Sequence, residues 1–172
     1  MMPSSGATPV PVDAPDVGRW CCFALGVDRF AVDSAGVVEV VRGRRLTSVP
    51  LAGAGVLGLL HMRGRIVPVI DPAATLGVTR EANRDGAGTH LVFALSDDWY
   101  GIAVDEMLDV IEIPAALVER PTAASGRGTA VRGTFAAADG LVHLLDPEGM
   151  IHSLVRQPHQ GISRGGSHEG GE

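Results

Sequence analysis

The chain contains no lysine, and all fourteen of its basic residues are arginine. The absence matters most for Asp71, because an aspartate that follows an apolar strand is where a receiver domain accepts a phosphoryl group. Such a site needs a lysine, a hydroxyl and a second acidic pair to handle the phosphoryl charge. We therefore interpret Asp71 as a capping residue, since an aspartate followed by proline suits the start of a helix. The pattern predicts a short helix over about Pro72 to Leu76 that ends at Gly77.

Cysteine is nearly absent: Cys21 and Cys22 are the only two, and they are adjacent in the chain. Adjacent cysteines do not form an ordinary structural disulfide with one another, which is consistent with a reducing compartment. Strand alternation along Trp20 to Leu25 predicts one sulfur in the core and one outside. No Cys-x-x-Cys or metal-ligand spacing accompanies the pair, so a thiol-dependent enzyme is a distant alternative.

Motifs for catalysis and metal binding are missing. The sequence has no Gly-x-Ser-x-Gly, no phosphate-binding glycine-rich loop that opens a helix and no convincing pair of carboxylates. Four histidines are scattered without the spacing of zinc ligands: His61, His90, His143 and His152. We therefore expect no catalytic residues, no cofactor and no metal site.

Long apolar runs are also absent, because charge or glycine interrupts each one well before the ~20 residues of a membrane-spanning helix. The net charge of −6, the pI near 5.4 and the lack of a basic run argue against nucleic-acid binding. With 45% hydrophobic residues, the 172-residue chain can bury a core unaided. We expect a cytoplasmic protein that binds other proteins, with no nucleic-acid partner and no direct membrane insertion.

Two polar ends flank an apolar middle that repeats itself. We predict that residues 1–18 and 156–172 are flexible tails, because they are polar and lack any hydrophobic periodicity. Within residues 19–155, Phe-Ala-Leu at 23–25 recurs at 93–95, and Ala-Val-Asp at 31–33 recurs at 103–105. Two related halves are predicted, about 19–78 and 89–155, with the boundary at Thr79 to Gly88 and a further loop over Val118 to Ala130.

Each half contains a glycine-led apolar strand that ends in Asp-Pro, at Gly64 to Pro72 and at Gly140 to Pro147. In the first of them Pro68 interrupts a β-branched run, so we expect it at a sheet edge, a bulge or a barrel corner. Short strands separated by turn signals are typical of small barrels or sandwiches. Halves of this size are marginal alone and should bury an apolar seam between them.

The ordered motifs resemble the CheW-like family of bacterial chemotaxis coupling proteins over about Arg19 to Val155. The resemblance rests on Val-Leu-Gly-Leu-Leu-His-Met-Arg-Gly-Arg-Ile-Val-Pro-Val-Ile-Asp at 56–71, on Ala-Val-Asp-Glu-Met-Leu-Asp-Val at 103–110, and on Gly-Leu-Val-His-Leu-Leu-Asp at 140–146. It implies a mainly β fold of two intertwined, five-stranded, SH3-like barrels with short helices. It also implies a non-enzymatic adaptor between the cytoplasmic tip of a chemoreceptor and the regulatory domain of a CheA-like histidine kinase, recruited to membrane-associated receptor clusters.

The resemblance further implies six partner-binding residues: Val37, Glu39, Arg63, Gly64, Val104 and Met107. Val37 and Glu39 match receptor-contacting positions of the family, and Arg63 matches the arginine of its Asn-Leu-Arg-Gly turn. The chain departs from the family pattern where His61 and Met62 replace Asn and Leu, and where Pro72-Ala73 replaces Leu-Arg. A diverged adaptor that binds only the receptor or only the kinase is therefore the main alternative.

Overall fold

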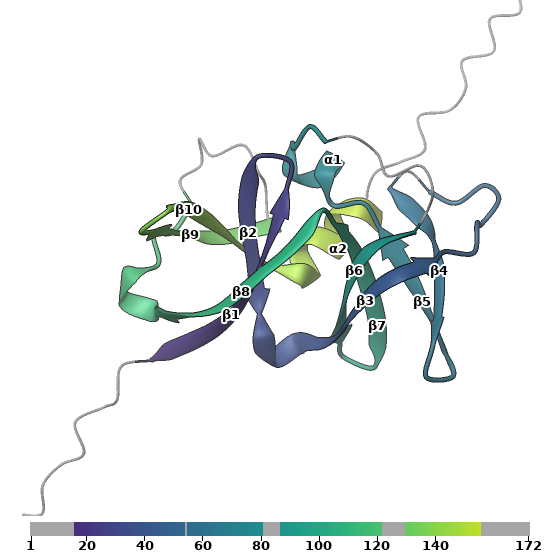
Figure 1. Cartoon of the computed structure of the whole chain (residues 1–172), viewed down its shortest axis with the longest axis horizontal. Helices are drawn as coiled ribbons and strands as arrows, with labels where there is room; N and C mark the ends of the chain where they lie inside the picture. The colour runs from purple at the N-terminus through teal and green to yellow at the C-terminus, as the bar shows by residue number, and fades with distance from the viewer. Residues whose placement is uncertain (1–15, 54, 81–86, 122–129, 156–172) are drawn as a thin grey trace, which may run out of the picture.

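The computed structural model describes residues 16–53, 55–80, 87–121 and 130–155 (Figure 1). Residues 1–15 and 156–172 of the expected tails lie outside the described residues, as do most of the expected loop at 118–130 and most of the expected boundary at 79–88. The first strand begins at Val17, so the last two residues of the expected N-terminal tail belong to it.

In the described residues ten strands form two five-stranded sheets, which confirms the predicted mainly β fold. We call the first sheet barrel A; its order is β8-β1-β2-β10-β9, with β1 at Val17–Leu25, β2 at Asp28–Asp33, β8 at Glu106–Pro114, β9 at Val131–Ala137 and β10 at Gly140–Leu145. The second is barrel B; its order is β3-β6-β7-β5-β4, with β3 at Val37–Arg45, β4 at Val56–Met62, β5 at Arg65–Ile70, β6 at Ala87–Leu95 and β7 at Asp98–Val104.

Both sheets curl toward closure through a matching pair of bridges. In barrel B, Thr47 and Leu59 exchange backbone hydrogen bonds of 2.8 and 2.9 Å, which link the segment after β3 to β4. In barrel A, Glu119 and Thr134 exchange bonds of 2.9 and 2.8 Å, which link the segment after β8 to β9. Each bridge covers part of a sheet edge that would otherwise leave backbone groups unpaired.

The two sheets do not follow the two halves of the sequence. Barrel B is continuous from residue 37 to 104, whereas barrel A combines β1 and β2 with β8, β9 and β10. The chain crosses from barrel A to barrel B through the 3-10 helix η1 (Ser34–Gly36) and returns through the single residue Asp105. Each predicted half, 19–78 and 89–155, therefore contributes strands to both barrels.

Three apolar clusters form the core of the part of the chain that the structure describes. One fills barrel A around Trp20, Cys22 and Leu144, and a second fills barrel B around Leu60, Val67 and Val92. The third and largest lies between the barrels and includes these buried side chains: Phe23, Phe30, Phe93, Ile102 and Met150. We call this third cluster the seam; helix α2 (Pro147–Val155) lies between the barrels and contributes Met150 and Ile151 to it (Figure 1).

The seam corrects the prediction for the cysteines. Alternation along β1 holds, because Cys22 faces the interior of barrel A and Cys21 faces the seam. The second face of β1 is covered by the other barrel, however, so both thiols are buried and free, and neither lies outside.

The two Asp-Pro motifs act as predicted. The Asp71 carboxylate accepts a 2.9 Å hydrogen bond from the Ala73 backbone N–H and precedes helix α1 (Ala73–Leu76), which ends at Gly77 in the left-handed conformation. The Asp146 carboxylate accepts a 3.2 Å bond from the N–H of Glu148 at the start of α2. Aspartate thus satisfies a backbone donor at both helix starts.

Candidate partner-binding surface

A two-residue turn joins β4 to β5 and presents Arg63. Arg63 and Gly64 have φ angles of +50° and +73°, and Met62 pairs with Arg65 across the hairpin. Positive φ at both central positions is the geometry of a type I′ turn, whose twist matches that of the flanking strands. Glycine adopts this conformation freely, but arginine does not, so the turn holds the exposed Arg63 side chain at some conformational cost.

Arg63 reaches a second predicted site residue on another strand. Its Nη2 lies 2.8 Å from Oε2 of Glu39 in β3, and the two side chains are 65% and 39% exposed. An ion pair this accessible to solvent adds little to stability. Both charged groups therefore remain available to a partner, and the structure brings together Glu39, Arg63 and Gly64 from segments more than twenty residues apart in sequence.

Val37 lies at the start of β3, opposite Phe93 of β6, and is half-buried against the seam. We call Val37, Glu39, Arg63 and Gly64 the turn surface. All four belong to barrel B, and the β4–β5 hairpin and η1 both lie along the lower edge of the molecule in Figure 1.

The other two predicted residues flank the crossover at Asp105. Met107 pairs with Phe23 of β1 and is half-buried against the seam, whereas Val104 is only 4% exposed and belongs to the seam itself. Val104 is therefore a buried core residue beside the crossover, and its side chain offers almost no surface to a partner. Met107 belongs to β8 of barrel A, whereas the four residues of the turn surface belong to barrel B.

Three of the four departures from the family pattern are buried. Met62 packs in the interior of barrel B, and Pro72 and Ala73 are buried at the start of α1. Leucine-to-methionine changes in a core largely conserve volume and shape. Only His61 is exposed. Its backbone carbonyl accepts a 3.3 Å hydrogen bond from Arg44. None of the four departures is a residue of the turn surface.

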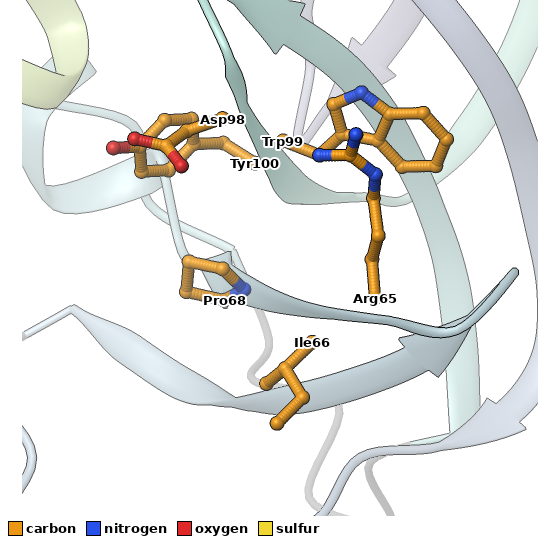
Figure 2. A pocket seen from close by; sticks show the side chains of 6 residues that line it. All are labelled: Arg65, Ile66, Pro68, Asp98, Trp99 and Tyr100. Carbon is orange, nitrogen blue, oxygen red and sulfur yellow. The ribbon is translucent and has the colours of Figure 1, made fainter.

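A hollow of about 360 Å³ lies beside the turn surface and was not anticipated from the sequence (Figure 2). It is lined by Arg65, Ile66, Pro68, Asp98, Trp99 and Tyr100. The Arg65 guanidinium lies 4.8 Å from the Trp99 ring centroid and donates a 3.1 Å hydrogen bond to the Asp97 carbonyl, so it spans one end of the hollow.

Comparison of the two barrels explains the hollow. The parallel pair β10 and β2 matches three residues, ending with Leu144 opposite Ala31, whereas β5 and β7 match only Val69 with Gly101 and Ile70 with Ile102. Pro68 stands immediately before this shorter ladder, and proline has no N–H to extend it. β5 lies between β7 and β4 in the sheet, so it is an inner strand. Pro68 nevertheless pairs only with Leu59 of β4, because the ladder with β7 begins at Val69. Pro68 thus lies at a local sheet edge, one of the three places that the sequence predicted for it.

The buried thiols do not form a nucleophilic site. Burial raises the pKa of Cys22 to about 11 and also raises the pKa of Cys21. The thiolate is the reactive form, so both groups are held in the unreactive state near neutral pH. In the described part of the chain, no three His, Cys, Asp or Glu side chains are grouped as metal ligands, and none of the helices is long and apolar enough to cross a membrane.

Sequence reasoning also missed Arg80, whose side chain is 6% exposed. It lies in the stretch that we interpreted as a boundary because the stretch breaks every apolar pattern. The structure places its guanidinium between two aspartates, with Nη2 3.0 Å from Asp71 and Nη1 2.7 Å from Asp105. The only sequence signal was that both aspartates follow apolar strands.

The chain is similar in sequence to one protein family. The model of the CheW-like domain family matches residues 19–155. Chemotaxis protein CheW of Treponema pallidum is 28% identical over 102 residues, which cover 58% of this chain and 60% of that protein. Protein FrzA of Myxococcus xanthus is 31% identical over 101 residues, which cover 58% of this chain and 62% of that protein. The matched segment thus spans about three fifths of each of these relatives.

A solved structure has the same fold. The scaffolding protein TtCheW from Thermoanaerobacter tengcongensis superposes with a TM-score of 0.69, covering 75% of this chain and 88% of that one, at 22% identity. At this identity the likeness shows a shared fold and nothing more.

Proposed function

The chain belongs to the CheW-like domain family, and from that premise we propose that it is a chemotaxis adaptor that couples the cytoplasmic tip of a chemoreceptor to a CheA-like histidine kinase. We further propose that it acts in the cytoplasm and is recruited to membrane-associated receptor clusters. The protein would contribute complementary surfaces and no bond-making chemistry.

One observation carries the proposal most directly: the exposed ion pair between Arg63 and Glu39. Two residues proposed as partner contacts are brought together by folding, and they are joined by an interaction that the fold itself hardly needs. Charged groups at the rim of an interface set partner choice and association rate by complementarity of charge. The turn surface is therefore the proposed receptor contact, supported by Gly64, which the turn requires, and by Val37.

Met107 is the proposed contact outside the turn surface. Its half-buried side chain borders the seam, and Val104 packs beneath the same crossover. An adaptor must hold two partners at once, and contact residues on both barrels suit that task. Separate binding measurements with receptor and with kinase assign Met107 to one of them.

A charge-swap experiment tests the turn surface. The double variant Glu39→Arg with Arg63→Glu keeps an ion pair within the protein but reverses both charges toward a partner. The affinity of the protein for receptor-containing membranes, measured by co-sedimentation, should fall by more than about tenfold, as expected for the loss of interface hot spots. Full retention of binding by the double variant, with the native fold intact, would remove both charges from the interface.

Sedimentation of the wild-type protein, with and without the kinase, distinguishes a coupling protein from a diverged adaptor. Membranes with receptor alone and membranes with receptor plus kinase are sedimented in parallel, and kinase autophosphorylation is assayed in the pellet. A coupling protein brings the kinase into the pellet; an adaptor restricted to one partner binds receptor or kinase but does not join them.

A further inference from the structure

Residues of both barrels meet at Asp105, the single residue by which the chain passes from barrel B back to barrel A. One carboxylate oxygen accepts a 2.6 Å hydrogen bond from the backbone N–H of Gly26, in the β1–β2 turn of barrel A. The other oxygen lies 2.7 Å from Nη1 of Arg80, which follows α1 in barrel B. The Asp105 N–H also donates a 3.1 Å bond to the Ala24 carbonyl.

Arg80 extends this contact to the start of α1. Its Nη2 lies 3.0 Å from Oδ1 of Asp71, the oxygen that caps α1 through Ala73. We call Gly26, Asp71, Arg80 and Asp105 the crossover clamp. A guanidinium suits this place because its planar, forked donors can hold two carboxylates in fixed directions, which a lysine ammonium cannot do.

The segments of the clamp are also in close contact. Gly26 has a φ of +58°, and a Cβ atom at this position would lie 2.8 Å from the Thr79 carbonyl oxygen and 3.2 Å from Cγ1 of Val78. The β1–β2 turn of barrel A and the residues before Arg80 in barrel B are therefore in direct contact without room for a side chain. In Figure 1 this region lies at the top, with the β1–β2 turn beside α1.

The seam and the clamp differ in what they fix. The seam joins the barrels through apolar contacts, whose stabilising effect comes from the area removed from water and depends little on the relative orientation of the groups. The clamp adds charge-assisted hydrogen bonds whose geometry is specific. The 6% exposure of the Arg80 side chain makes its pairing costly to disrupt, because a buried charge depends on its partners.

We propose that Arg80 is a positioning residue that fixes the two barrels relative to one another at the Asp105 crossover. It thereby sets the distance and direction from Met107, two residues beyond the crossover, to the turn surface on barrel B. The consequence for partner binding rests on the proposed adaptor function, whereas the consequence for the barrel arrangement does not.

The test uses two clamp variants, Arg80→Gln and Asp105→Asn, and one control, Arg29→Gln. Arg29 forms an ion pair with Asp139 that lies wholly within barrel A. Asp71 and Asp105 keep 24% and 36% of their side-chain surface exposed, so water can solvate them when Arg80 is replaced. Should R80Q not fold, Arg80→Lys, which keeps one charge without the fork, takes its place.

Amide residual dipolar couplings report the arrangement of the barrels independently of stability. In the wild-type protein and in R29Q, couplings from barrel A and barrel B should fit one common alignment tensor. In R80Q and D105N, each barrel should still fit a tensor of its own, but the two tensors should differ. One common tensor in the folded clamp variants would overturn the proposal.

Recruitment of the kinase to receptor-containing membranes by this protein is the second measurement, because it depends on the contacts of both barrels. R80Q should weaken it by about fivefold or more, the lower limit usual for coupling between separate sites, and R29Q should leave it unchanged. Altered tensors with unaltered recruitment would overturn the positioning role. A wild-type protein that does not recruit the kinase would refute the adaptor function, and the dipolar couplings would still decide whether Arg80 fixes the barrels.

Discussion

Arg63 occupies a backbone conformation that suits asparagine better than arginine. With Gly64 it forms a type I′ turn, for which Asn-Gly is a preferred sequence. Arg63→Asn should therefore keep the free energy of unfolding within about 1 kcal/mol of wild type, because relief of the left-handed strain offsets loss of the exposed ion pair.

The same substitution removes the guanidinium that we assign to the receptor contact. Binding to receptor membranes should fall by more than about tenfold, the effect expected of a hot-spot residue. Urea unfolding and membrane sedimentation on one preparation separate the two effects. A variant that is as stable as wild type and binds equally well would show that Arg63 contacts no partner.

Cys22 makes the stability of the fold depend on pH in the alkaline range. Its pKa is raised by burial from 9.0 to about 11 in the folded state, so the unfolded chain ionises first as the pH rises. Its contribution to stability is complete below pH 9 and should be lost progressively between pH 9 and about 11.

Two measurements check this prediction. Urea midpoints across the alkaline range should fall less steeply in Cys22→Ala than in wild type, although the variant is less stable at every pH because it leaves a cavity. Ellman's reagent at pH 7.5 should label neither thiol of the native protein and both after unfolding. Rapid labelling of the native protein would contradict the burial of β1 on both faces.

At the scale of single elements, the tight approach of the β1–β2 turn to residues 78–80 has a matched control. Gly26 and Gly43 both have positive φ angles, +58° and +66°, but a Cβ at Gly43 meets nothing within 4 Å. Gly26→Ala should destabilise the protein by about 1–3 kcal/mol more than Gly43→Ala, because only Gly26 adds a clash to the backbone strain. Equal urea midpoints for the two variants would show that the contact yields without cost.

Elements set by local chemistry were predictable from the residues themselves, whereas the intertwining of the two barrels was implied only by the family resemblance. The Asp-Pro helix starts follow from capping, and the local edge at Pro68 follows from its missing N–H. The repeat showed that two halves are related, but it carries no information on which strands pair. Alternation along β1 was correct for the cysteines, yet only the other barrel could show that both faces are covered. Arg80 looked like a linker residue because its two partners lie 9 and 25 positions away.

For the whole molecule, the exchange of strands predicts how fragments behave. Residues 19–77 contain β1 to β5 and complete neither sheet, whereas residues 37–104 contain all five strands of barrel B. The first fragment should be aggregated or molten. The second should form β structure but self-associate, since it exposes Leu91, Phe93 and Ile102 of the seam.

Circular dichroism and analytical ultracentrifugation of the two fragments check this expectation. Sharp, dispersed amide resonances from a monomeric 19–77 fragment would contradict the strand pairing, because that fragment lacks the β6 and β7 neighbours of β3 and β5.

We propose that the whole molecule joins a chemoreceptor to a histidine kinase. The most direct test is sedimentation of the kinase with receptor-containing membranes, in the absence of this protein, in its presence, and in the presence of the Arg63→Asn variant. We predict that the kinase enters the pellet and is activated there only when the wild-type protein is present, and that the variant recruits much less of it. Equal kinase recruitment in all three samples would contradict the account.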